Sequence, residues 1–302
     1  MHRYVHVHER IKGASAVVAL ETNVLAHGLP SPANLESAEA QSTAVRKAGA
    51  EPAVIGVING RILVGAGDDD IRHLAGQDDP EGRGPAPWKV AARDLPYVVA
   101  RCLDGATTVS ATAAVAQLAG IGVMSTGGIG GVHPGGLDVS ADLPLLARCP
   151  MVVVCSGPKH VVDPAATAEW LETHGVLVVG YRTTRLPGFL APGWLPLEHT
   201  VDSIDEAATL VRAARAFGST SAIVLVQDPP SDAAMDPDEL TELSAAATAA
   251  AAKAGVRGKS RTPFELDWLA RRTGGRSLGA NLALLEANAG LAGELAVALA
   301  GS

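Results

Sequence analysis

Short apolar runs rich in β-branched residues alternate along the chain with longer amphipathic stretches. The predicted strands are residues 15–21, 53–58, 107–110, 122–126, 151–155, 176–180 and 222–226. The predicted helices between them are residues 36–47, 95–103, 111–119, 165–173 and 204–217. Continuously apolar strands indicate burial on both faces of a sheet. The repeated strand–helix order therefore predicts an α/β fold, an α/β/α sandwich with a mostly parallel central sheet.

The last third of the chain changes to an almost wholly helical pattern. Its predicted helices are residues 238–254, 263–272 and 281–299, and we expect them to cover the sheet and to close one side of the site. Glycine and proline mark loops at residues 30–34, 78–88, 127–136 and 182–194. None of these loops is long or polar enough to be a linker, and no internal repeat is present. We therefore predict a single domain over residues 1–302.

The composition is that of a globular chain without a broad basic surface. Of its 302 residues 47% are hydrophobic, and the formal net charge is −8. Such a charge does not attract a phosphate backbone over a wide area, so we expect no nucleic-acid partner. Residues 1–10 carry charges and histidines where a secretory signal needs an apolar run, and no later stretch approaches about 20 uninterrupted apolar residues. We expect a cytoplasmic protein without a membrane partner.

The three cysteines are Cys102, Cys149 and Cys155, which lie in apolar sequence surroundings without the spacing of a metal site. An odd number of cysteines does not suit a disulfide framework. We expect all three to be reduced core residues.

Candidate chemistry follows three of the predicted strands, because ligands of parallel α/β sheets collect at the carboxyl ends of strands. This rule selects residues 21–27, residues 126–133 and residues 156–160. The second segment runs from Thr126 to His133 and opens a stretch with six glycines at residues 127–136. Such a stretch can bring backbone N–H groups close to an anion, or it can be a set of tight turns.

Oxygen-bearing side chains come directly after the glycine-rich stretch. Asp138, Ser140 and Asp142 stand at alternate positions before a predicted helix. One interpretation is that Ser140 or Asp142 caps that helix. Asp138 has no such structural role in the sequence and is a candidate metal ligand. A site of oxygen ligands with few carboxylates suits Mg²⁺ or Mn²⁺, with water in most of the coordination sphere.

Lys159 and Glu21 are the candidates for covalent and proton-transfer chemistry. Lys159 follows a strongly apolar strand; it is either an ordinary solvated lysine or a partly desolvated amine near Lys89 that can attack an aldehyde carbon. Lys89 has its own alternative, a salt bridge to Asp94. Glu21 ends a buried strand, where burial raises the pKa of a carboxyl group and suits it to proton transfer, unless backbone amides bind it. Asn281 is either a polar residue on a buried helix face or an orienting amide.

Taken together, several blocks resemble the pseudouridine-5′-phosphate glycosidase family. The blocks are VVALET…HGLPSPAN, KVAARDLP, GATTVSATAAVAQLAGI, STGGIGGVH, DVSADL, VVVCSGPK, TPFEL and SLGANLALL. They occur in the family's order from about Val17 to about Leu299. The resemblance covers nearly the whole chain and is far more specific than any one motif.

The resemblance implies an α/β/α fold, a homotrimer, and reversible conversion of pseudouridine 5′-phosphate and water into uracil and ribose 5-phosphate. It implies that Lys159 is a Schiff-base nucleophile, Glu21 the proton donor and Asp138 the carboxylate that anchors Mn²⁺ or Mg²⁺. The implied substrate-binding residues are Lys89, Val109, Thr126, His133, Ser140, Ala141, Asp142 and Asn281.

One departure from the family pattern concerns the loop after His133. Pro134 stands where the family has an arginine, and the segment before Asp138 is a few residues shorter. This predicts altered contacts to the base or the phosphate. The alternative function is therefore a biosynthetic C-glycosynthase that joins ribose 5-phosphate to a smaller heterocycle such as a five-membered cyclic imide. A sugar-phosphate-binding protein without turnover is a third hypothesis, but Lys159 and Glu21 are both retained.

Overall fold

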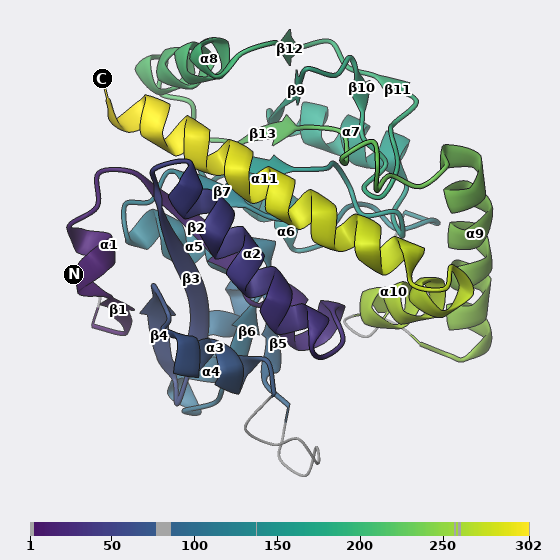
Figure 1. Cartoon of the computed structure of the whole chain (residues 1–302), viewed down its shortest axis with the longest axis horizontal. Helices are drawn as coiled ribbons and strands as arrows, with labels where there is room; N and C mark the ends of the chain where they lie inside the picture. The colour runs from purple at the N-terminus through teal and green to yellow at the C-terminus, as the bar shows by residue number, and fades with distance from the viewer. Residues whose placement is uncertain (1–2, 77–85, 137, 257, 259–260, 302) are drawn as a thin grey trace.

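A central β-sheet lies between two layers of helices in the computed structural model of the chain (Figure 1). The structure describes residues 3–76, 86–136, 138–256, 258 and 261–301. The described strands of the main sheet are β1 (Val5–Val7), β2 (Val17–Glu21), β3 (Glu51–Ile58), β4 (Arg61–Val64), β5 (Trp88–Val90), β6 (Gly105–Thr107), β7 (Val123–Ser125), β8 (Val152–Cys155), β9 (Leu177–Tyr181), β12 (Thr200–Val201) and β13 (Ile223–Val226). A separate antiparallel pair consists of β10 (Arg185–Leu186) and β11 (Leu195–Pro196).

The sheet is mostly parallel, as the sequence predicted. Its order is β1-β4-β3-β2-β7-β8-β13-β9-β12, with β6 beside β3 and β5 beside β6. The antiparallel pairs are β3 with β4 and β3 with β6. In the centre, Leu20 of β2 pairs with Ser125 of β7, and Ser125 pairs with Val154 of β8. This register brings the carboxyl ends of β2, β7 and β8 to one edge of the sheet.

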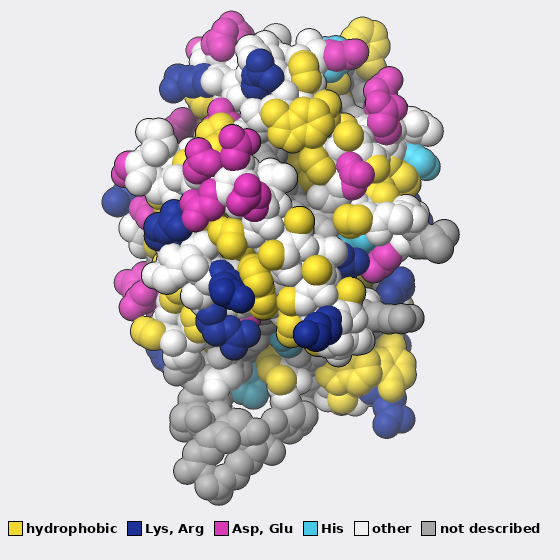
Figure 2. Space-filling model, turned by 90° about the vertical axis from the view of Figure 1, so that its right-hand side faces the viewer, with side chains coloured by type: hydrophobic (Ala, Val, Ile, Leu, Met, Phe, Trp, Pro, Cys, Tyr) yellow, Lys and Arg dark blue, Asp and Glu magenta, His cyan; other side chains and the backbone are white. Residues whose placement is uncertain are grey.

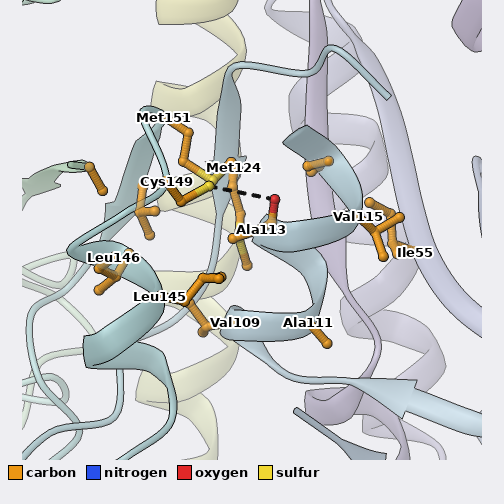
Figure 3. Close-up of a cluster of buried hydrophobic side chains, with 14 of the residues drawn as sticks. Ile55, Val109, Ala111, Ala113, Val115, Met124, Leu145, Leu146, Cys149 and Met151 are labelled. Atoms are coloured by element: carbon orange, nitrogen blue, oxygen red, sulfur yellow. Dashed lines mark hydrogen bonds between the residues drawn. The ribbon is translucent and has the colours of Figure 1, made fainter. Parts of the chain in front are cut away.

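Side chains alternate between the two faces of the central strands, which is why both faces are covered. In β8, Val153 and Cys155 pack with α5 (Val109–Leu118), α6 (Asp142–Leu146) and α7 (Pro164–Thr173). Val152 and Val154 pack on the opposite side with α2 (Ala33–Lys47), α8 (Ile204–Ala216) and α11 (Arg276–Ala300). Figure 3 shows the first of these cores around Cys149, whose thiol donates a hydrogen bond to the Ala113 carbonyl.

Polar caps and prolines determine where several of the long helices begin. The side chains of Asp163, Ser203 and Asp236 accept backbone N–H groups in the first turns of α7, α8 and α9 (Pro237–Lys253). Pro164 and Pro237 occupy the first helical positions, where the missing N–H costs nothing. The predicted starts of these helices at residues 165, 204 and 238 are within one residue of the observed ones.

The predicted helical last third is confirmed, and its helices pack in two different places. α9, α10 (Arg261–Arg272) and the first turns of α11 form their own apolar cluster around Leu240, Leu269 and Leu284. α11 then runs across the sheet beside α2 (Figure 1). Within the described residues, α11 is the one helix long and apolar enough to cross a bilayer, and half of its most apolar stretch is buried inside this fold.

The described side chains on the face that carries α9 and α10 include both acidic and basic residues (Figure 2). Figure 2 shows acidic and basic side chains interspersed with apolar ones on this face.

Three sequence predictions need correction. Residues 107–110 are not a strand: β6 ends at Thr107, Thr108 precedes the helix in an extended conformation, and α5 begins at Val109. The threonines and valine there have high strand propensity, but the following alanines extend a helix back to them. Cys102 is exposed, not a core residue, although Cys149 and Cys155 are buried. The predicted loop 182–194 contains β10.

Other short elements escaped the sequence analysis because they carry little periodicity. They are the strands β1, β4, β5, β11 and β12, and the helical segments α1 (Glu9–Lys12), η1 (Val24–Gly28), α3 (Asp68–Leu74) and η2 (Ala92–Asp94). The predicted helix 95–103 corresponds to the shorter α4 (Leu95–Ala100). Most of the predicted loop 78–88 lies outside the described residues; its last residue, Trp88, begins β5.

Candidate active site

A cavity of about 220 Å³ opens at the carboxyl ends of β2, β7 and β8. Residues that the sequence analysis singled out make up much of its wall: Glu21, Lys89, Thr126, His133, Asp138, Ser140, Ala141, Asp142, Lys159 and Asn281. They come from points more than 250 residues apart, and the sheet and α11 bring them together. Convergent polar groups of this kind in one pocket indicate a binding or catalytic site.

Val109 is the one predicted substrate contact whose side chain does not reach the cavity. As the first residue of α5, Val109 is fully buried in the core, and the preceding Thr108 lines the cavity instead. A contact from Val109 to a ligand would have to come from its backbone at the start of α5. The substrate contact at Val109 stays a prediction, limited to its backbone.

Glu21 is held at the end of β2 with only half of its carboxylate satisfied. Its side chain is buried, Oε1 accepts a hydrogen bond from the Thr126 hydroxyl, and Oε2 has no partner among the described residues. Burial raises the pKa of Glu21, and the nearby charge of Lys159 and the Thr126 hydroxyl offset part of that rise. The group is therefore suited to carrying a proton at a pH where an exposed glutamate has lost it.

Lys159 occupies a tight turn after β8 and is half-buried at the cavity wall. Its backbone N–H donates to the Ile129 carbonyl at 2.9 Å, which ties the turn to the glycine-rich loop. Gly157, with φ of +81°, makes this turn possible, because a Cβ there would lie 2.2 Å from the Pro187 oxygen. Within the described part of the chain, no carboxylate lies within the 4.0 Å of an ion pair with Lys159. Lys159 therefore lines the cavity without a fixed counter-ion among the described residues, close enough to Glu21 for its charge to affect the pKa of that carboxyl group.

His160 lies next to Lys159, at the end of the selected segment 156–160, and the sequence analysis assigned it no role of its own. Its ring stacks on Phe189 with 5.7 Å between centroids, and neither ring nitrogen has a partner in the described structure. Burial, together with the charge of Lys159, lowers the pKa of His160 to about 4. The ring is therefore neutral at physiological pH and adds no second positive charge next to the amine.

His27 presents an unpaired acceptor to the same cavity. Burial lowers the pKa of His27, and the charge of Lys89 lowers it further, while a hydrogen bond to the Pro87 backbone opposes the shift. Its Nε2 is buried without a described partner. His27 lies in η1, the segment after Glu21, so the chain places an acid and a neutral imidazole on one short stretch.

Asp142 and Ser140 turn out to have structural partners. The Asp142 carboxylate accepts the N–H of Ser110 at the start of α5, at 3.0 Å, and the N–H of Gly130 at 2.9 Å. The Ser140 hydroxyl accepts the Asp142 N–H at 3.2 Å. The N-cap of α6 is nevertheless Ala141, and Asp142 is the first helical residue, so neither Ser140 nor Asp142 is the N-cap that the sequence suggested. Gly130 must be glycine, because a Cβ would lie 2.1 Å from the Ser140 hydroxyl. These bonds shape the glycine-rich loop that lines the cavity.

Asp138 and His133 lie at the more open side of the cavity. Asp138 is exposed, and its backbone carbonyl accepts the His133 N–H at 2.8 Å. Burial lowers the pKa of His133, the charge of Asp138 opposes this shift, and the ring Nδ1 is buried without a described partner. The described residues contain no group of three histidine, cysteine or carboxylate side chains that would hold a metal by themselves. A metal at Asp138 would therefore keep mostly water ligands.

The C-terminal helices close the remaining side of the cavity. Asn281, buried on α11, and Leu285 one turn later line it directly. α10 adds Thr262, Pro263 and Leu266, which the sequence analysis did not assign as site residues. The TPFEL block was the signal that could have found them, since it matched the family pattern without a stated role.

Known proteins resemble the chain over its whole length. The profile of the family described as indigoidine synthase A like protein matches residues 6–298. The pseudouridine-5′-phosphate glycosidase of Myxococcus xanthus is 45% identical over 97% of this chain and 96% of its own length. The protein of that name from Gemmatimonas aurantiaca is 46% identical over 97% of this chain and 94% of its own length.

Two solved structures share the fold closely. An indigoidine synthase A-like protein from Thermotoga maritima superposes with a TM-score of 0.90 at 35% identity, covering 99% of this chain and 98% of its own. The prealnumycin C-glycosynthase AlnA, solved in complex with ribulose 5-phosphate, has a TM-score of 0.89 at 34% identity, covering 100% of this chain and 98% of its own.

Proposed function

The chain belongs to the family of indigoidine synthase A-like proteins, and from this membership we infer that it is a C-glycosidase. The proposed reaction is the reversible conversion of pseudouridine 5′-phosphate and water into uracil and ribose 5-phosphate. Relatives that carry the name pseudouridine-5′-phosphate glycosidase, about 45% identical over nearly the full length, support this substrate. The structural observation that supports the proposal is that Glu21 and Lys159 line the same cavity.

The carbon–carbon bond explains why an amine is needed. In an N-glycoside the base leaves on an electronegative nitrogen, whereas here the leaving atom is carbon. In the cleavage direction, the lone pair of the neutral Lys159 amine bonds to C1′ as the bond from C1′ to the ring oxygen breaks. One proton of the amine passes to that oxygen, which restores a lone pair on the nitrogen. The nitrogen lone pair then forms the C=N bond of an iminium ion while the bond from C1′ to the base breaks.

The base carbon requires a proton as its bond to C1′ breaks. Glu21 supplies it, because its raised pKa favours the protonated carboxyl group, the residue lines the cavity, and Oε2 has no hydrogen-bond partner among the described residues. Water then adds to the iminium, ribose 5-phosphate leaves, and the proton released from water restores Glu21. The reverse sequence forms the C-glycoside.

Trapping of the covalent intermediate tests the proposal directly. Sodium borohydride added to the protein with ribose 5-phosphate reduces an iminium to a stable amine, so the sugar mass should appear on the peptide that contains Lys159. Lys159→Arg keeps the charge but not the nucleophile and should show no adduct. The surface substitution Lys12→Arg is the matched control and should behave as wild type. Turnover of pseudouridine 5′-phosphate without any adduct on Lys159 would contradict the lysine mechanism.

Asp138 is the proposed anchor for Mn²⁺ or Mg²⁺. A single exposed carboxylate, without a group of three histidine, cysteine or carboxylate side chains among the described residues, fits a hydrated hard cation better than zinc, which needs several nitrogen or sulfur ligands. When bound, the ion would supply positive charge that orients oxygen atoms of the sugar phosphate or the base. Asp138→Asn should weaken Mn²⁺ binding measured by calorimetry, whereas Asp163→Asn, at the start of α7, should not.

A biosynthetic C-glycosynthase is the second candidate function. The likeness to AlnA and the presence of Pro134 in the loop after His133 favour it. A panel of uracil and five-membered cyclic imides with ribose 5-phosphate decides between the two functions. Uracil as the best acceptor supports the glycosidase, and preferential coupling of an imide supports the synthase.

A further inference from the structure

Asn288 is a fully buried amide on α11 that no step of the proposed reaction uses. It lies seven residues after Asn281, two helical turns further along the same face. Asn281 lines the cavity, whereas Asn288 lies below it, against the ends of the strands. A polar side chain so deeply buried is retained only where it makes several hydrogen bonds.

The hydrogen bonds of Asn288 reach three neighbouring strands. Its Nδ2 donates to the Thr126 carbonyl, just after β7, at 3.0 Å, and lies 3.4 Å from the Gly127 carbonyl. Nδ2 also lies 3.2 Å from the hydroxyl of Ser156, just after β8. Its Oδ1 accepts from Gln227, just after β13, at 2.9 Å. One amide thus fixes the points where three strands turn into loops.

Both proposed catalytic groups are attached to these loops. Thr126 donates the hydroxyl hydrogen bond that holds Glu21. Ser156 begins the turn that ends at Lys159, and the Ser156 N–H is bonded to the Gly127 carbonyl at 2.9 Å. The path from Asn288 to the acid therefore passes through one residue, and the path to the nucleophile passes through one short turn.

We propose that Asn288 is a positioning residue that sets the placement of Glu21 relative to Lys159. This inference rests on the proposed C-glycosidase function. It does not make Asn288 a catalytic residue, because the side chain touches neither the cavity nor a reacting atom. Leucine at this position would remove the donor to the Thr126 carbonyl and the acceptor for the Gln227 amide, and the loops would shift to find other partners. A shift of about 1 Å at a reacting group can cost about 100-fold in rate.

Asn288→Leu tests the proposal against Ser277→Ala, a buried polar residue of the same helix that bonds only with Thr273 among the described residues. We expect Asn288→Leu to lower kcat by about 10- to 100-fold with KM changed by less than about 3-fold. The pH profile should move as well. The Thr126 hydroxyl lowers the pKa of Glu21, so loosening it raises that pKa and shifts the basic limb of kcat upward. Ser277→Ala should keep the wild-type kcat and profile.

Gln227→Leu is a second variant that leaves Asn288 in place and removes one of its supports. Gln227 is half-buried, so this substitution should be tolerated by the fold. We expect a smaller fall in kcat and a shift of the basic limb in the same direction. If Asn288→Leu fails to fold, Gln227→Leu decides the question.

A kcat within 2-fold of wild type and an unchanged pH profile, in whichever of the two variants folds, would overturn the positioning role. Equal losses in Ser277→Ala would overturn it too, since they would mean general loosening of α11. Absence of both turnover and a Lys159 adduct in wild type is a failure of the proposed function. In that case, crystal structures of wild type and Gln227→Leu test positioning alone: an unchanged Thr126–Glu21 bond and Lys159 placement rejects it.

Discussion

At the scale of the residue, burial in and next to the cavity favours the uncharged form of several ionisable side chains. It raises the pKa of Glu21 and lowers the pKa values of His27, His133 and His160. Each shift has desolvation as its largest cause, because a charge loses its hydration there without gaining a full set of partners. The same feature favours the protonated form of Glu21 and the neutral form of the three imidazoles.

Glu21→Gln should abolish the proton transfer while preserving the shape of the site. We expect kcat for cleavage to fall by about 10²- to 10⁴-fold, as for loss of a general acid. In wild type, kcat should decline as pH rises through the raised pKa of Glu21, since the protonated form is the active one. Steady-state kinetics over pH 5–9 should show this limb in wild type and not in the variant. A limb that survives in Glu21→Gln would assign it to another group.

The same substitution should stabilise the fold. Because the pKa of Glu21 is higher in the folded than in the unfolded state, stability is lost as pH rises from the unfolded value of 4.5 to the folded value. Glutamine has no charge to desolvate and escapes this loss. Thermal denaturation should give Glu21→Gln a Tm a few degrees above wild type at pH 8 and near wild type at pH 4. A lower Tm than wild type at pH 8 would contradict the desolvation argument.

His160 makes the opposite contribution to acid stability. Its pKa is lowered from 6.5 to about 4, so the unfolded state takes up a proton first and stability falls as pH drops through that window. The loss reaches about 3 kcal/mol near pH 4. In urea denaturation at pH 7 and pH 4, His160→Phe should lose less stability between the two pH values than wild type. An equal loss in both proteins would show that the ring is hydrated in the fold.

At the scale of the element, α11 links the covering layer of the sheet to the site. It contributes Asn281 to the cavity and packs Gly127 against Leu284 and Leu285, with a virtual Cβ of Gly127 only 3.1 Å from each. Further along, it lies against α2 so closely that a Cβ on Gly293 would be 2.7 Å from the Cβ of Ala48. The long apolar sequence of this helix is accounted for by these contacts on its buried side.

Two glycine substitutions in α11 should have opposite effects on stability. Gly279→Ala adds a methyl group where no atom lies within 4 Å, so it should stabilise the helix by about 0.5–1 kcal/mol. Gly293→Ala places the same group against α2 and should cost about 1–3 kcal/mol. The free energies of unfolding from urea titrations test both. Equal effects at the two positions would mean that α11 does not approach α2 as described.

At the scale of the whole molecule, one sheet edge collects groups that the chain supplies at distant points. Glu21, Lys159 and Asn281 meet because β2, β7 and β8 are neighbours whose carboxyl ends coincide, and because α11 returns across them. We propose that this unit is a single domain that works as a cytoplasmic homotrimer, as the family resemblance implies.

The proposed trimer can be tested by measuring the mass of the protein in solution. Light scattering coupled to size-exclusion chromatography should give a mass three times the 30.7 kDa of one chain. Dilution that yields monomers with full activity would show that each cavity is complete in one subunit. A monomer at all concentrations would remove the trimer from the proposal.

Local pattern and residue type by themselves determined the fold class and most of the long elements. Continuous apolar runs define buried strands wherever they occur, and caps and prolines define helix starts near Asp163, Ser203 and Asp236. The blocks that resemble a known family pointed to Glu21 and Lys159. The local sequence did not predict the short strands, because such strands are defined by their pairing with a neighbouring strand. It did not predict the exposure of Cys102 either.

Only the tertiary structure decided which groups share a cavity and what each is free to do. Asp142 is occupied by backbone N–H groups from two other segments, Val109 turns into the core, and Glu21 keeps one oxygen unpaired. These differences arise from contacts across the sheet and from desolvation, which depend on distance in space. A sequence sets which groups are available, but hydrogen bonds and buried charges depend on neighbours that can lie more than a hundred residues away in the chain.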